Sequence, residues 1–148
     1  MNDLIAEGAI IPAKLGVDLY RQQVLDQHGD LPGLVQVRMM ADTGAEMSLI
    51  DESFAKALGL RWINDQMIVG VSQKPELHRV YAATLHMPIE EPVPRIVQIQ
   101  ITVAGMRENV GRAKFDGLLG RRFLNVFDLL YLGPQDTFSL STSAFPDE

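Results

Sequence analysis

Residues 39–50 read Met-Met-Ala-Asp-Thr-Gly-Ala-Glu-Met-Ser-Leu-Ile, and this stretch decides the fold. An apolar strand runs into Asp42, Thr43 and Gly44, and the sequence then returns to apolar residues that we expect to start a helix. A carboxylate at the end of a buried strand is unfavourable unless it is solvated or held by partners. The Thr43 hydroxyl can donate and accept hydrogen bonds, and Gly44, which lacks a Cβ atom, lets the backbone approach a second carboxylate or a substrate. The stretch therefore predicts an aspartate that is held in place for chemistry.

The length and composition are those of one folded domain spanning residues 1–148. The chain is 47% hydrophobic and 22% charged, which are ordinary values for a globular protein. Its net charge is −6, and its densest basic spot is only Arg121-Arg122. Phosphate neutralisation needs many more clustered basic side chains, so we expect no nucleic-acid partner.

The absence of cysteine and of long apolar runs bears on the cellular compartment and on the kinds of site that the chain can form. With no cysteine, the chain has no disulfide, no thiolate metal site and no cysteine nucleophile. The first seven residues are interrupted by Asn2, Asp3 and Glu7, unlike a signal peptide, and no run is long enough to span a membrane. We expect a soluble cytoplasmic protein without a membrane partner.

Strand signals dominate the chain. Val35–Met39 alternates apolar and polar residues ahead of Asp42, and residues 97–103 alternate most clearly of all. Residues 62–69 and 77–87 flank a breaker-rich segment, as in a hairpin, and residues 129–132 and 137–140 form a second hairpin around a Gly-Pro turn. Residues 104–114 are expected to form a loop, and residues 16–24 fit either a strand or a helix.

Two short helices interrupt the strands. Asp51 and Glu52 favour a helix start, and Gly59 favours its end. A second helix is expected over residues 121–126, after a Gly-Leu-Leu-Gly stretch that echoes the apolar-to-glycine pattern around Asp42. The sequence predicts a mainly β fold, closed or folded over into a barrel, with one or two short helices.

A single Asp-Thr-Gly suggests half of a catalytic pair. Two carboxylates that share one proton can hydrolyse a peptide bond, because one activates water while the other protonates the carbonyl oxygen. Two like charges about 3 Å apart do not both ionise, so such a pair titrates as a unit. The echo at Leu118-Leu119-Gly120 carries no acid. A second copy of the chain must supply the other aspartate, which predicts a two-fold homodimer with the site on its axis.

These motifs in this order resemble the retropepsin family, the retroviral-type aspartic proteases and their cellular and bacterial relatives. The resemblance covers about residues 35–140 and leaves residues 1–34 as an N-terminal extension of uncertain role. It implies a closed β-barrel and a homodimeric aspartic endopeptidase that acts on peptides or proteins, with no metal and no organic cofactor.

The resemblance also implies a role for each position of the Asp-Thr-Gly loop. Asp42 is similar to the catalytic aspartate, and Thr43 to the residue whose hydroxyl ties the two active-site loops together across the dimer axis. Gly44 is similar to the glycine whose carbonyl receives a substrate amide, and Ala45 completes the active-site loop.

The hairpin between Met67 and Tyr81 looks like the flap that closes over substrate, with Val69, Gly70 and Val71 near its tip. Retroviral flaps are richer in glycine than this one, whose tip has only Gly70.

Residues beyond the loop are expected to support it. Leu118, Leu119 and Gly120 look like the apolar-apolar-glycine element that packs beneath the aspartate loop. Beyond the motif, Glu46 lies two residues after Gly44 and Arg121 directly follows Gly120. We predict a Glu46–Arg121 ion pair that locks the loop to the second helix.

Three other interpretations compete with the protease. Asp-Thr-Gly alone could be a surface turn, and a retropepsin-like dimer could bind peptides without cleaving them. His28, His78 and His86 could suggest a metal-dependent hydrolase, but His78 and His86 are eight residues apart and neither has carboxylates at ligand spacing. Asp116 is another candidate acid, although next to Gly117 it is more typical of a turn.

Overall fold

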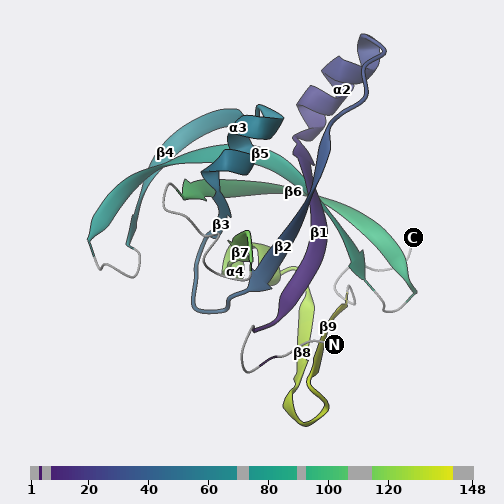
Figure 1. Cartoon of the computed structure of the whole chain (residues 1–148), viewed down its shortest axis with the longest axis vertical. Coiled ribbons are helices and arrows are strands. Elements are labelled where there is room, and N and C mark those ends of the chain that lie inside the picture. The colour runs from purple at the N-terminus through teal and green to yellow at the C-terminus, as the bar shows by residue number, and fades with distance from the viewer. Residues whose placement is uncertain (1–3, 5–7, 70–73, 90–92, 107–114, 142–148) are drawn as a thin grey trace.

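The computed structural model describes residues 4, 8–69, 74–89, 93–106 and 115–141, and they form a mainly β structure with few short helices (Figure 1). The strands are β1 (Ile10–Val17), β2 (Leu34–Ala41), β3 (Ser48–Asp51), β4 (Arg61–Val69), β5 (Pro75–Ile89), β6 (Arg95–Met106), β7 (Gly117–Leu119), β8 (Asp128–Leu132) and β9 (Thr137–Ser141). The helices are α2 (Leu19–Gln27), α3 (Glu52–Leu58), α4 (Arg121–Leu124) and the short 3-10 turn η2 (Gly133–Gln135).

Six strands close into a mixed barrel. Their order is β1-β2-β7-β3-β6-β5, and pairing of β1 with β5 completes the ring. The β2–β7 and β3–β6 pairs are parallel, and the others are antiparallel. Among the described strands, β4 pairs with β5 alone, and the two extend from the barrel as an arm, while β8 and β9 form a separate sheet (Figure 1). The predicted mainly β closed barrel is confirmed.

The first strand comes from the segment that precedes the motifs. In β1, Leu15 lies opposite Val35 of β2 on one side and Leu85 of β5 on the other. Its side chain is fully buried. β1 is therefore a wall of the barrel, and the undecided residues 16–24 divide between the end of this strand and α2.

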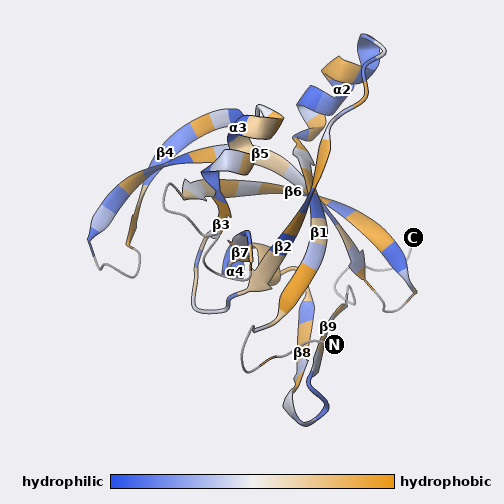
Figure 2. Ribbon diagram, viewed as in Figure 1, coloured by the Kyte–Doolittle hydropathy of each residue, from blue (hydrophilic) through white to orange (hydrophobic). Residues whose placement is uncertain are grey.

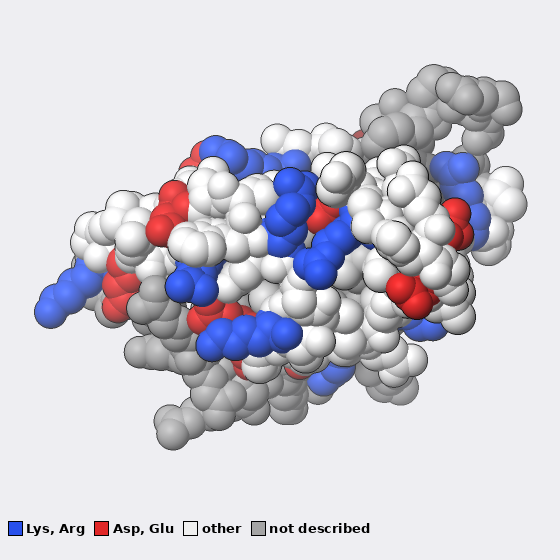
Figure 3. All heavy atoms as spheres, turned by 90° about the horizontal axis from the view of Figure 1, so that it is seen from above, with Lys and Arg blue, Asp and Glu red and all other residues white. Residues whose placement is uncertain are grey.

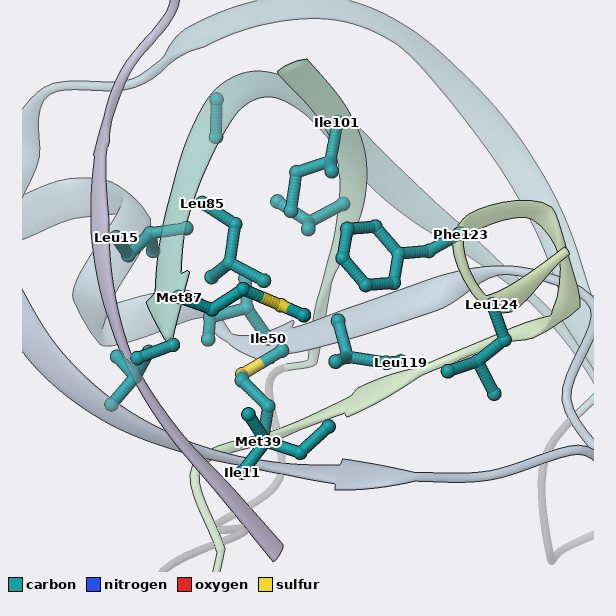
Figure 4. Close-up of a cluster of buried hydrophobic side chains, with 14 of the residues drawn as sticks. Ile11, Leu15, Met39, Ile50, Leu85, Met87, Ile101, Leu119, Phe123 and Leu124 are labelled. Atoms are coloured by element: carbon teal, nitrogen blue, oxygen red, sulfur yellow. The ribbon is translucent and has the colours of Figure 1, made fainter. Parts of the chain in front are cut away.

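The core fills the barrel with side chains from every wall. Leu15, Ile50, Leu85 and Leu119 are among its fully buried members, and they point into one cluster (Figure 4). Along the β4–β5 arm, hydrophilic and hydrophobic bands alternate (Figure 2). Most β4 residues are exposed to solvent. The barrel is stabilised by apolar burial, whereas the arm depends mainly on its own pairing.

Local signals place α3 as expected. The Asp51 side chain accepts a hydrogen bond from the Ser53 amide at 3.0 Å, and Gly59 ends the helix in the left-handed conformation with φ +62°. Both hairpins also form where the sequence predicted them.

Two predicted boundaries are wrong. Residues 48–50 do not start a helix; they belong to β3, because β6 and β7 pair with both of its edges and Ile50 is buried between them. The loop expected over residues 104–114 does not include residues 104–106, since β6 continues to Met106 beside β3 and β5. Residues 107–114 lie outside the described residues.

Candidate active site

Asp42 directly follows β2 at the end of a barrel wall. Its amide donates to the carbonyl oxygen of Leu119 at 2.9 Å, which continues the pairing of β2 with β7. Its own carbonyl accepts from the Ala45 amide at 3.2 Å, which closes a tight turn. The half-buried aspartate is thus fixed by backbone bonds on both sides.

The carboxylate of Asp42 is oriented by its own loop. The Gly44 amide donates to Oδ1 at 2.9 Å, and a Cβ atom on Gly44 would lie 3.1 Å from that same oxygen. Within the described part of the chain, no other hydrogen bond to this carboxylate is found, and Thr43 and Gly44 are exposed. The loop therefore presents a pre-oriented carboxylate at the protein surface.

The Leu-Leu-Gly element lies against the aspartate loop. In parallel register, Leu118 pairs with Met40, and Leu119 pairs with Ala41. The Gly120 amide donates to the Ser48 hydroxyl at 3.2 Å. These contacts bring residues far apart in sequence into one support for the turn that carries Asp42.

The first turn of α4 binds the carbonyl groups of the same loop. The Arg121 amide donates to the carbonyl of Ala45 at 2.8 Å, and its guanidinium donates to the carbonyl of Thr43 at 2.8 Å. The Arg122 amide donates to the carbonyl of Glu46 at 3.1 Å. Backbone groups that a helix start leaves unpaired are thereby satisfied by the loop.

The predicted Glu46–Arg121 ion pair is wrong in its basic partner. The Glu46 carboxylate lies 3.2 Å from the guanidinium of Arg122. The backbone bonds that anchor α4 turn Arg121 toward Thr43 and Arg122 toward Glu46. Both members of the observed pair are largely exposed, so it contributes little to stability.

The β4–β5 arm reaches toward the loop through an apolar cluster. Ile68 of β4 and Leu49 of β3 pack against buried Met47, Val80 and Ala104. No sequence pattern distinguishes Ile68 from its apolar neighbours Met67 and Val69, so this packing was not predictable from β4. Val69 is 62% exposed at the end of β4, and the expected tip residues Gly70 and Val71 lie outside the described residues.

Asp116, the other candidate acid, binds backbone amides of two strands. Its side chain accepts from the Arg38 amide at 2.7 Å, and its carbonyl accepts from the Asp51 amide at 3.0 Å. It therefore links β2 to β3.

His78 and His86 each contact a different protein group. His78 Nδ1 lies 2.8 Å from the Gly105 carbonyl, and His86 Nε2 lies 3.3 Å from the Thr84 hydroxyl. Burial, followed by the charge of Lys14, lowers the pKa of His86. Among the described residues, no three possible ligands gather into a metal site.

On the face seen in Figure 3, several basic side chains gather near the centre, and acidic side chains lie beside and around them. None of the helices in the described ranges has the length and apolar character needed to cross a membrane.

The chain is similar in sequence to a known protein family. A family model described as aspartyl protease matches residues 28–123. The match includes β2, the Asp42 loop, the β4–β5 arm and Leu118-Leu119-Gly120. A search of curated proteins gives no match.

Proposed function

The chain belongs to the retropepsin-like aspartyl protease family, and we propose on this premise that it is a homodimeric aspartic endopeptidase. The observation that carries the proposal is the single Asp42 carboxylate, oriented by Gly44 and half-buried in a surface loop. One chain offers one such group, so two chains related by a two-fold axis complete the pair.

The proposed reaction uses a water molecule between the two Asp42 carboxyl groups. One carboxylate takes a proton from the water, whose oxygen attacks the peptide carbonyl carbon, while the protonated partner gives its proton to the carbonyl oxygen. The resulting tetrahedral intermediate, a gem-diol, breaks its C–N bond as the amine nitrogen takes up the proton of the pair, and one hydroxyl of the gem-diol returns its proton to the pair as the carboxylic acid product forms. The two aspartates are left sharing one proton, ready for another cycle. No metal or organic cofactor takes part.

The residues around Asp42 have proposed roles in holding the dimer and the substrate. Thr43 joins the two loops across the axis through its hydroxyl, and the Gly44 carbonyl accepts a substrate amide. The β4–β5 arm serves as the flap, with Val69, Gly70 and Val71 toward its tip. Substrate binds as an extended strand between flap and loop, and closure of the flap excludes water.

The apolar cluster supports this placement of substrate. Ile68 belongs to the arm and Leu49 to the strand after the aspartate loop, and both pack on the same buried residues. We infer that apolar substrate side chains bind beside this cluster.

Incubation of the purified protein with a peptide library over a range of pH tests the proposal. We expect cleavage by the unaltered protein and none by Asp42→Asn. Asp26→Asn, the same chemical change at an exposed position of α2, is the matched control and should cleave normally. Circular dichroism of both variants verifies that they are folded.

The same experiment identifies the catalytically inactive alternative. Peptide binding without cleavage by the unaltered protein would mean a retropepsin-like dimerisation or peptide-binding module. Cleavage that persists in Asp42→Asn, or that stops when a chelator is added, would contradict the proposed chemistry.

A further inference from the structure

The wall of the barrel is incomplete beside β3. This strand has 4 residues, whereas its neighbour β6 has 12. Their parallel pairing begins at Ser48, opposite Val103, and covers only the last part of β6. β5 pairs with the other side of β6 from Arg95 to Ala104. Among the described strands, none pairs with the second edge of β6 between Ile96 and Thr102.

A cavity of about 330 Å³ opens beside this unpaired edge. Its apolar lining comes from Ile99 and Ile101 of β6, from Met47, and from Phe123 and Val126 at and after α4. The side chains of Ile101 and Phe123 point toward one another (Figure 4). The volume lies within the range of pockets that bind small ligands or single side chains.

Arg122 gives the cavity a positive charge. It lines the cavity, and its guanidinium lies 3.2 Å from the carboxylate of Glu46. The two side chains are 60% and 62% exposed, so their attraction is weakened by solvent. A carboxylate on a bound molecule could therefore take the place of Glu46 at small cost.

The backbone edge determines which class of ligand fits. In an antiparallel pair, alternate residues direct both N–H and C=O away from the partner strand. On β6 between residues 96 and 102, these groups face the gap rather than another strand. A small apolar ligand would leave these N–H and C=O groups hydrogen-bonded only to water, whereas an extended peptide would form strand hydrogen bonds with them.

We propose that the free edge of β6 and the adjoining cavity form a second peptide-binding site, separate from the Asp42 site. Its ligand is an extended segment of a partner polypeptide that carries an apolar side chain next to an acidic one. The segment adds to β6 as a strand, the apolar side chain fills the cavity, and the acidic side chain pairs with Arg122. This goes beyond the proposed hydrolysis and does not depend on it.

Binding of a defined peptide tests the proposal. The probe is fluorescein-labelled Thr-Val-Leu-Asp-Val-Thr with blocked ends, added to the full chain in the presence of an excess of a statine-containing peptide, which occupies an aspartic protease site. We expect saturable binding by fluorescence anisotropy. In ¹⁵N nuclear magnetic resonance spectra, we expect the amide shifts to change at residues 96–102 and in α4.

Two matched comparisons separate the features of the site. Arg122→Glu should weaken binding about tenfold because attraction becomes repulsion, whereas Lys14→Glu, the same change on β1, should not. A probe with alternate backbone nitrogens methylated cannot pair as a strand and should not bind the unaltered protein.

Other outcomes overturn the proposal. These are the absence of saturable binding, equal binding of the methylated probe, or equal affinity in Arg122→Glu and Lys14→Glu. Shifts confined to the Asp42 loop, or binding that is seen only when the statine peptide is left out, would assign binding to the active site. That result would support the proposed function while refuting the second site.

Discussion

The carbonyl oxygen of Met47 lies 2.5 Å from the point where a Cβ atom on Gly120 would stand. The backbone of Gly120 is extended, with φ −86° and ψ 179°, a conformation open to any residue. Lack of space, rather than backbone conformation, therefore requires glycine here. This close approach allows α4 to begin directly against the aspartate loop.

Gly120→Ala should accordingly destabilise the protein and impair cleavage. The added methyl group meets rigid backbone, and overpacking of this kind costs about 1–3 kcal/mol. Gly33→Ala is the control, because its nearest neighbour would lie 3.6 Å away in ordinary contact. Urea unfolding of both variants measures the difference, and equal midpoints would refute the steric argument.

Mixing subunits tests whether the site is shared between chains. If dimers exchange freely and chains pair at random at saturating concentration, equimolar Asp42→Asn should reduce the activity per total protein to about a quarter, which is about half per unaltered chain. The Asp26→Asn variant, mixed in the same way, should cause no loss. Activity that stays proportional to the unaltered chain would point to a site complete within one subunit.

Arg121 and Arg122 should differ in their effect on activity. The Arg121 guanidinium binds the Thr43 carbonyl beside Asp42, whereas Arg122 makes an exposed pair with Glu46. We expect Arg121→Met to lower kcat several-fold through a less ordered loop. Arg122→Met should change stability by less than about 1 kcal/mol. Steady-state kinetics on the two variants compare neighbouring residues of the same type, and identical kinetics would contradict the assignment.

Asp18 should make stability depend on acid pH. Burial raises the pKa of its carboxyl group, but hydrogen bonds from the Arg21 amide and the Arg61 side chain, together with the Arg61 charge, lower it below its ordinary value. A carboxyl whose folded pKa is depressed stabilises the protein above the unfolded pKa, and this stabilisation is lost as pH falls through the folded value.

Asp18→Asn should therefore cost about 1–2 kcal/mol near neutral pH, because asparagine still caps α2 but carries no charge to pair with half-exposed Arg61. The difference from the unaltered protein should shrink below about pH 4. Urea unfolding from pH 7 to pH 3 measures it, with Asp26→Asn as the exposed control. A difference that is independent of pH would exclude the electrostatic contribution.

Leu15→Ala tests whether β1 is indispensable to the barrel. Its fully buried side chain lies in the core cluster, and such truncations cost about 2–5 kcal/mol. Lys14→Ala, on the exposed face of the same strand, should cost much less. Thermal unfolding compares the two, and similar melting temperatures would mean that β1 adds little to the folded state.

Local features of the fold were predictable because their signals lie close together in sequence. Asp51 and Gly59 cap α3 through hydrogen bonds to residues close by in sequence. The alternation of apolar and polar residues in β6 indicates that one face of the strand is buried. The Asp42 loop was equally clear, since its turn is closed by Gly44 and Ala45.

The remaining features depend on distant partners. Residues 48–50 resemble the start of a helix until β6 and β7 pair with them. The choice of Arg122 over Arg121 depends on how α4 is anchored to the loop. Among the described strands, part of one β6 edge stays unpaired because β3 is much shorter than β6, which no local pattern encodes.

The sequence separation between β1 and its partner β5 has a consequence for how the protein folds. β1 can pair with β2 early, but ring closure must wait until β5 is available, far along the sequence. Pairings between distant residues slow folding, because chain entropy is lost before contacts compensate for it. During synthesis on the ribosome, one edge of β1 therefore waits unpaired, and its exposed Pro12 and Lys14 are residues that discourage association with other strands in that interval.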